Sequence, residues 1–190
     1  MSLGNAVADD LSGSESVHGV LVSVFGSGVL ISGRSGVGKS ACALELIDRG
    51  HALVADDVVN VERQGESLIG SAPAVLFGSL EVRGLGIVDV RRLLGEVAAL
   101  DRSQINLCIE FADSSGEDVS DRTSSSVQSY SILGVEVPRI SFVVNGSQSL
   151  RVLVETAVRY ITRDGETASR QFVDRYNTSL IESLGSSDNH

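Results

Sequence analysis

Eight consecutive residues, Gly33-Arg34-Ser35-Gly36-Val37-Gly38-Lys39-Ser40, match the phosphate-binding pattern G-x-x-x-x-G-K-[ST] in full. Its glycines let successive backbone N–H groups turn inward around an anion, and the following helix N-terminus adds partial positive charge. Lys39 can reach the outer phosphates of a nucleotide, and the hydroxyl of Ser40 can bind Mg²⁺. The alternative is an ordinary glycine-rich turn with a surface lysine. A short apolar strand before the motif and an amphipathic helix after it favour the phosphate site.

Two adjacent carboxylates, Asp56 and Asp57, follow 17 and 18 residues beyond Lys39. They end an expected strand, and a strand–loop–helix–strand unit returns that strand beside the loop. A carboxylate there can ligate Mg²⁺ through water or accept a proton from an attacking hydroxyl. A solvated acidic turn remains the alternative.

Three further side chains are candidates for the same chemistry. His18 begins a strand that leads toward the loop, although a single histidine is more often structural than catalytic. Glu81 and Arg83 flank Val82 and precede Gly84-Leu85-Gly86. Alternation in an extended segment places Glu81 and Arg83 on one face, where they can bind metal and phosphate. A surface salt pair is the alternative.

The elements that must position these residues read as one α/β domain: a mixed β-sheet packed by helices around a phosphate-binding loop. The strands are expected at residues 20–25, 29–31, 51–55, 58–62, 67–69, 105–111 and 138–144. Helices are expected at residues 39–49, with Ala41, Leu44 and Ile47 inward, at 90–94, from 150 to 161, and through 172–181. The domain is expected to span residues 17–184, with flexible tails at 1–16 and 185–190 and a polar, flexible loop at 112–131.

Composition excludes several classes of protein. The chain has 190 residues and a formal net charge of −10, which disfavours nucleic acid as a partner. The apolar runs are too short to span a membrane, and the first 16 residues lack the features of a signal peptide. Cys42 and Cys108 form neither a disulfide framework nor a metal-binding spacing, and both fall at apolar positions typical of a core. A cytoplasmic location is therefore expected.

The segment VHGVLVSVFGSGVLISGRSGVGKSACALELIDRGHALVADD, followed by LEVRGLGIVDV, resembles the catalytic domain of the HPr kinase/phosphorylase family. The resemblance is dense from Val17 to Asp89 and continues faintly to the helix at Leu150. It implies a hexamer of phosphate-loop α/β domains that phosphorylates a serine of HPr, a small phosphocarrier protein. It also implies a reverse reaction that uses inorganic phosphate and releases pyrophosphate. ATP or pyrophosphate, with Mg²⁺, would be the phosphate donor.

The resemblance also implies roles for individual residues. Gly33 to Ser40 would bind the nucleotide, with Ser40 and Glu81 at the Mg²⁺. Asp57 would accept the proton in the kinase direction and donate it in phosphorolysis, and His18 and Lys39 would complete the active site. The surrounding phosphate and substrate region would include Asp56, Arg83, Gly84 and Gly86.

The chain also departs from the family pattern. The family usually has a separate N-terminal domain, which the first 16 residues cannot replace. Where the family reads Tyr-Asp-Arg-Leu-Gly, the chain reads Tyr130-Ser131-Ile132-Leu133-Gly134, so that Ile132 replaces a catalytic arginine. A family loop with two arginines reads Val143-Val144-Asn145-Gly146-Ser147-Gln148-Ser149 here. Because arginine suits bidentate phosphate recognition, the losses at 132, 145 and 148 predict weak or absent phosphorolysis.

Three functions follow from these residues. The first is a serine kinase acting on HPr or a related hydroxyl acceptor. The second is a nucleotide-dependent regulatory module, and the third is a kinase for a small metabolite on the same scaffold. A pure binding module has no need of Asp57 opposite the phosphates, which favours an enzyme.

Overall fold

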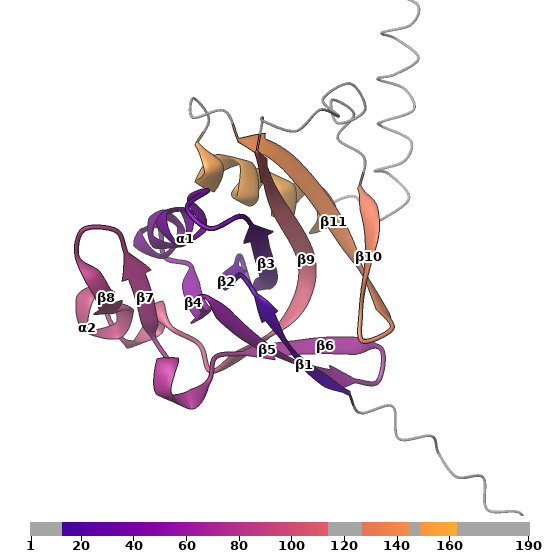
Figure 1. Ribbon diagram of the computed structural model, residues 1–190, viewed down its shortest axis with the longest axis horizontal. Helices are drawn as coiled ribbons and strands as arrows, with labels where there is room; N and C mark the ends of the chain where they lie inside the picture. The colour runs from indigo at the N-terminus through magenta and orange to yellow at the C-terminus, as the bar shows by residue number, and fades with distance from the viewer. Residues whose placement is uncertain (1–12, 114–126, 145–148, 163–190) are drawn as a thin grey trace, which may run out of the picture.

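A curled sheet forms the frame of the protein in the computed structural model, which describes residues 13–113, 127–144 and 149–162 (Figure 1). Nine strands of this described part lie in that sheet: β1 (Ser14–His18), β2 (Val20–Val24), β3 (Ser27–Gly33), β4 (Ala52–Ala55), β5 (Val58–Gln64), β6 (Ser67–Ser71), β9 (Arg102–Asp113), β10 (Gln128–Ile132) and β11 (Val135–Val144). Their main order is β1-β5-β6-β9-β3-β2-β4, and β11 and β10 extend it from β9. A separate hairpin pairs β7 (Ser79–Val82) with β8 (Gly86–Asp89).

The helices are α1 (Lys39–Asp48), α2 (Val90–Leu94) and a helix that begins at residue 150 and is described to 162, with short 3-10 helices η1 (Ala74–Leu76) and η2 (Glu96–Ala98). In Figure 1, α1 and the 150–162 helix lie together beside β3 and β9, and the β7–β8 hairpin stands next to α1. Both helices pack into the larger apolar core, to which α1 contributes Leu46 and the second helix contributes Val154.

Strand β2 lies between two apolar cores, which explains its sequence Val20-Leu21-Val22-Ser23-Val24. All five residues are buried. Val20, Val22 and Val24 face the core beneath the helices, whereas Leu21 faces a second core enclosed by β1, β5, β6 and β10. Side chains alternate between the faces of a strand, so a strand covered on both sides favours apolar residues at most positions, and Ser23 is the exception in β2.

Strand β9 connects these two parts of the sheet. Its first residues pair with β6 in antiparallel register, and its later residues run parallel to both β3 and β11. Phe111, near its end, is buried at 1% exposure and lies opposite Gly33, the residue where the phosphate-binding loop begins. The long strand therefore supports the loop from below.

The fold class predicted from the sequence is confirmed, and the helix at 90–94 and the hairpin at 58–71 form as expected. The predicted inner face of α1 is correct for Ile47, which is buried, and wrong for Ala41, which is exposed. Leu44 is partly buried and packs against the larger core, to which the helix also contributes Cys42, Ala43 and Leu46. Ala41 and Leu44 both line a cavity beside the helix.

The predicted boundaries of the flexible segments are also corrected. Strand β1 begins at Ser14, three residues inside the expected tail, because a backbone ladder with β5 holds this polar segment. The expected loop at 112–131 is narrower, since β9 continues to Asp113 and β10 starts at Gln128. The expected tail at 185–190, the helix through 172–181 and the centre of the loop lie outside the described residues.

Cys42 and Cys108 are buried free thiols, as expected for core positions. Burial raises the pKa of each thiol to about 12, so neither forms a reactive thiolate near neutral pH. No helix in the described ranges is both long enough and apolar enough to cross a membrane.

At Gly28 the backbone of β3 comes very close to the backbone of β9, and this close approach gives a test of the fold. A methyl group there would overlap the backbone carbonyl oxygen of Gln104, and the N–H of Gly28 donates to Asn106 Oδ1 at 3.1 Å. Backbone cannot rotate away as a side chain can, so we expect Gly28→Ala to lower the free energy of unfolding by about 1–3 kcal/mol. Urea unfolding would measure this, with Ser27→Ala as the neighbouring control. If the Gly28→Ala variant were as stable as wild type, the result would contradict the register of β3 and β9.

Candidate active site

The phosphate-binding loop connects β3 to α1, as the motif predicts. Lys39, only 7% exposed, donates from Nζ to the carbonyl oxygens of Gly33 at 2.8 Å and Arg34 at 3.1 Å. These bonds close the loop around its own lysine. Gly38 precedes the helix with a φ of 108°, a left-handed conformation that favours glycine. The loop thus presents the N-terminus of α1 toward solvent.

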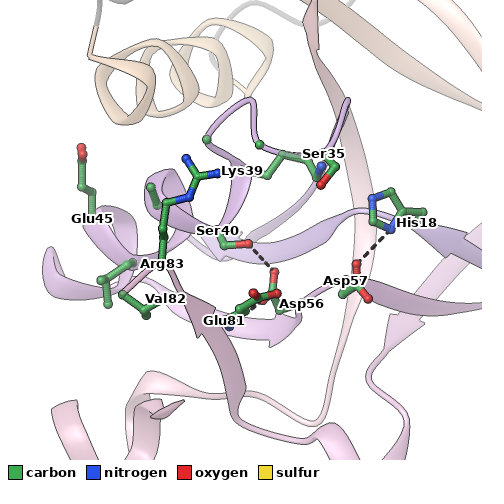
Figure 2. Close-up of a pocket in the computed structure, with 14 residues that line it drawn as sticks. His18, Ser35, Lys39, Ser40, Glu45, Asp56, Asp57, Glu81, Val82 and Arg83 are labelled. Carbon is green, nitrogen blue, oxygen red and sulfur yellow. Dashed lines mark hydrogen bonds and ion pairs between the residues drawn. The ribbon is translucent and has the colours of Figure 1, made fainter. Parts of the chain in front are cut away.

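A cavity of about 490 Å³ opens beside this loop (Figure 2). From the predicted motif, Ser35, Gly36, Gly38, Lys39 and Ser40 line it, whereas Val37 packs against the core. Gly33 and Arg34 contribute the carbonyls that hold the lysine. The remaining lining residues are His18, Ala41, Leu44, Glu45, Asp56, Asp57, Glu81, Val82 and Arg83. The cavity therefore brings together all the charged candidates from separate parts of the sequence except Arg34.

Asp56 is the most enclosed carboxylate of the site. It follows β4, is 8% exposed, and accepts two hydrogen bonds from different segments. Ser40 Oγ donates to Oδ1 at 2.9 Å, and the backbone N–H of Glu81 donates to Oδ2 at 2.9 Å (Figure 2). Asp56 thereby joins the start of α1 to the β7–β8 hairpin.

Burial raises the pKa of Asp56 above its ordinary value. The hydrogen bonds from Glu81 N–H and from Ser40 act in the opposite direction because they stabilise the carboxylate, whereas the nearby charge of Asp57 adds to the increase. The hydroxyl and carboxylate oxygens here are the hard donors that Mg²⁺ prefers.

Asp57 lies beside Asp56 in sequence but in a different environment. Its φ is 67°, and the N–H of Val58 donates to the carbonyl oxygen of Asp56 at 2.8 Å, which closes a tight turn. The N–H of Gly19 also donates to the carbonyl oxygen of Asp57 at 3.1 Å. The turn directs the Asp57 side chain away from Asp56 into solvent, where it is 67% exposed.

His18, at the end of β1, pairs with this carboxylate: Nδ1 lies 3.1 Å from Asp57 Oδ1 (Figure 2). Both side chains line the cavity. A left-handed φ at a non-glycine residue, with a side chain held at a cavity rim, is a feature that recurs at catalytic positions. The structure thus brings His18 to the site, where the sequence alone favoured a structural role.

The β7–β8 hairpin supplies Glu81 and Arg83, and both line the cavity. The backbone hydrogen bond from Glu81 to Asp56 anchors the hairpin to the site. Gly84 lies in the turn of the hairpin and Gly86 begins β8, with φ values of 90° and 86° that favour glycine. Neither lines the cavity, and the place in the phosphate region that the resemblance implies for them stays a prediction.

The sequence did not predict that α1 forms one wall of the cavity. Leu44 and Glu45 line it together with Ala41 and Val82. Glu45 lies on the exposed side of α1, and the signal available was its helical spacing of four residues from Ala41.

The structure describes one of the three positions where the family pattern has arginine. Ile132 is 2% exposed and packs in the second core with Leu21 and Val137. It does not line the cavity. The effect of this replacement on phosphorolysis stays a prediction. Positions 145 and 148 lie outside the described residues.

The donors at the site fit a magnesium ion that is held partly by phosphate. Across the described ranges, no three His, Cys, Asp or Glu side chains converge as a metal cluster. Mg²⁺ typically uses one or two protein ligands together with substrate phosphates and water. The Ser40 hydroxyl and the Asp56 carboxylate, with Glu81 beside them, provide such a set.

Comparison with known proteins shows the family of the chain. Residues 9–176 match the family model described as the HPr Serine kinase C-terminal domain. The chain belongs to this family. The HPr(Ser) kinase/phosphatase from Coxiella burnetii has a similar solved structure, with a TM-score of 0.70 and 35% sequence identity over 77% of this chain and 95% of that one.

Curated relatives cover nearly the whole chain. HPr kinase/phosphorylase from Lactiplantibacillus plantarum is 40% identical over 100% of this chain, and that from Geobacillus thermodenitrificans is 42% identical over 95%. The chain spans 61% and 59% of the lengths of these two relatives.

The raised pKa of Asp56 gives a prediction with a defined sign. The folded chain binds the proton of Asp56 more tightly than the unfolded chain, so ionisation of Asp56 reduces stability as the pH rises above 3.8. Asparagine avoids this loss, and it keeps an oxygen for Glu81 N–H and an amide N–H for Ser40 Oγ. Without nucleotide or Mg²⁺, we expect Asp56→Asn to be at least as stable as wild type at pH 7.

Urea unfolding between pH 3 and 8 would measure the difference. It should shrink as the pH falls toward 3.8, where Asp56 becomes protonated in both states. A variant less stable than wild type at pH 7, and relatively more stable in acid, would show that the carboxylate is stabilising in the fold.

Proposed function

We propose that the chain is an ATP- and Mg²⁺-dependent serine kinase that phosphorylates HPr or a related protein acceptor. The observation that carries the proposal is the Asp57 carboxylate, held by His18 at the rim of a cavity whose floor is a phosphate-binding loop. The names of the relatives, HPr kinase/phosphorylase, support HPr as the acceptor. A cytoplasmic location and a hexameric assembly are part of the same proposal.

The loop binds the nucleotide phosphates through its backbone N–H groups and the positive end of α1. Lys39 exchanges its bonds to the carbonyls of Gly33 and Arg34 for bonds to the outer phosphates. Its ammonium then stabilises the negative charge that spreads over the transferred phosphoryl group. Arg83, which lines the same cavity from the β7–β8 hairpin, adds a second cation.

Asp57 acts as the general base. Its carboxylate accepts the proton from the acceptor serine, while the serine oxygen forms a bond to the γ-phosphorus and the bond from that phosphorus to the bridging oxygen of ADP breaks. His18 contacts Oδ1 of Asp57 and orients the carboxylate toward the substrate. In the reverse direction, the protonated Asp57 would return its proton to the serine oxygen.

Magnesium would be held by Ser40 and Glu81, with Asp56 positioned to contact the ion directly or through water. When bound, the ion neutralises charge on the phosphates and draws them into line for transfer. Asp56 orients the Ser40 hydroxyl through its 2.9 Å hydrogen bond and holds Glu81 in place through the backbone.

The first test replaces the base. We expect Asp57→Asn to reduce phosphorylation of HPr by about 100-fold or more, because general base catalysis typically contributes that much. ATP binding, followed by calorimetry, should stay near the wild-type value, because the phosphate-binding loop is unchanged. Phosphate transfer from ATP to HPr, with Mg²⁺ present, is the measurement.

Wild type and the variant should also be assayed with a cell extract as the source of acceptors. Transfer at the parent rate by Asp57→Asn would mean that the base is misassigned. Wild type that binds ATP but phosphorylates nothing would favour a regulatory module, and transfer to a small molecule alone would favour a metabolite kinase.

We also propose that phosphorolysis is weak or lost. The support is the sequence at three positions, where Ile132, Asn145 and Gln148 stand in place of arginines of the family pattern. Phosphorolysis must bring an inorganic phosphate against a phosphoserine, and missing cations weaken that step most. We expect little pyrophosphate release from phospho-HPr under conditions that give full kinase activity. A coupled pyrophosphate assay would measure it, and robust release would overturn this part of the proposal.

A further inference from the structure

A buried carboxylate and a buried histidine, together with two partly exposed arginines, form a group away from the reacting atoms. Glu155, on the 150–162 helix, is 7% exposed, and its Oε1 lies 3.2 Å from Nε2 of His51, which is 8% exposed. On the other side, Arg151 Nη1 donates to Glu155 Oε2 at 3.3 Å, and Arg159 Nη1 approaches the same oxygen at 4.0 Å. One enclosed carboxylate therefore meets three basic side chains.

This group connects the 150–162 helix to the C-terminal half of α1. His51 follows the end of α1, and its backbone N–H donates to the carbonyl oxygen of Leu46 at 3.2 Å. Arg151 also reaches Glu45 on α1, with Nε 3.9 Å from Oε2. Glu45 lines the cavity, so the ionic network extends from the buried histidine to the wall of the candidate active site.

The same helix meets the phosphate-binding loop directly. Its first residue, Leu150, comes so close to Gly38 that a Cβ atom built at Gly38 would lie 3.3 Å from Leu150 Cδ1. Leu150 also packs against the larger core. A shift of the helix along its axis would therefore change the contact between Leu150 and Gly38, the last glycine before α1.

Phe25 holds the far end of the network. Its ring meets that of His51 edge-on, with centroids 4.7 Å apart, and the guanidinium of Arg159 lies 4.3 Å from the Phe25 centroid. Phe25 lies in the turn between β2 and β3, so the network also fixes the sheet that leads into the loop. Four segments thus meet in the network around Glu155 and its partners: α1, the residue before β4, the β2–β3 turn and the 150–162 helix itself.

We propose that Glu155 is a positioning residue for nucleotide binding. Through His51 and Arg151 it fixes the 150–162 helix against α1, and that placement sets the loop at Gly38 in the shape that binds phosphate. The inference rests on the proposed function only in requiring that the loop binds a nucleotide.

The energetics of buried ions favour a positioning role over simple stabilisation. Removing charges from water costs free energy that an ion pair recovers only with good geometry, so an apolar cluster would serve stability as well. Hydrogen bonds and ion pairs differ from apolar contacts in being directional, and they specify one arrangement of the helices. In the described part of the chain no side-chain hydrogen bond or ion pair joins Asp57 or His18 to Glu155 or its partners, so the chemical step should be spared.

The test compares two replacements of the carboxylate in the full chain. Calorimetry would measure the dissociation constant for ADP with Mg²⁺, and steady-state phosphorylation of HPr would give KM for ATP and kcat. We expect Glu155→Ala to raise the dissociation constant and KM by about tenfold, with kcat within about twofold of wild type. Glu155→Gln keeps polar atoms for His51 and Arg151 and should recover part of the affinity.

Two variants on the same helix serve as controls. Val158→Ala removes buried methyl groups, so it should lower the melting temperature about as much as Glu155→Ala does. It should not weaken ADP binding. Thr156→Ala alters an exposed position and should change neither. If Glu155→Ala fails to fold, the comparison of Glu155→Gln with Val158→Ala carries the test.

Weaker ADP binding by Val158→Ala, in proportion to its lost stability, would reduce the role of Glu155 to general stabilisation and overturn the inference. Unchanged ADP binding by both Glu155 variants would do the same. Wild type that binds no nucleotide would instead contradict the proposed function, which keeps the two failures distinct.

Discussion

The buried carboxylate of Asp56 is the contact on which the geometry of the candidate site depends. It accepts hydrogen bonds from Ser40, at the start of α1, and from the backbone of Glu81, in a hairpin 25 residues further along the chain. A buried charge needs such partners, because an unsatisfied carboxylate is costly in an apolar environment. These two hydrogen bonds hold the start of α1 next to the β7–β8 hairpin. They thereby bring Glu81 and Arg83 to the phosphate-binding loop.

The neighbouring Asp57 illustrates how one dipeptide supplies two different acids. Asp56 is enclosed and hydrogen-bonded, and burial raises its pKa, whereas Asp57 reaches into solvent beside His18. The left-handed φ of Asp57 and the tight turn closed by the N–H of Val58 end β4 here, and they direct the Asp57 side chain to the cavity rim while Asp56 stays enclosed. Separate environments give two carboxylates separate roles, one in holding the site together and one in exchange of a proton with substrate.

The sequence predicted those parts of the site that depend on local signals. The motif from Gly33 to Ser40 specifies a loop between a strand and a helix, and both neighbours are readable from apolar spacing. Strand β1 escaped prediction because the partner that orders it, β5, lies about 45 residues away, and its own residues are polar. The burial of Ile132 escaped prediction as well, because its similarity to a family motif said nothing about the direction of its side chain.

The hydrogen bonds of Lys39 indicate which step of phosphate binding costs free energy. Its ammonium is bonded to the carbonyls of Gly33 and Arg34, so a phosphate must replace two existing hydrogen bonds rather than order a disordered loop. Such an exchange is favourable only when the loop amides already face the incoming anion, since otherwise the ordering entropy of the backbone is added. Three contacts hold the loop amides in this orientation: β9 pairs with β3 at Gly33, Asp56 binds Ser40, and Leu150 packs against Gly38. Each of these supports comes from a different region of the chain, which is why a short motif needs a whole domain to bind phosphate.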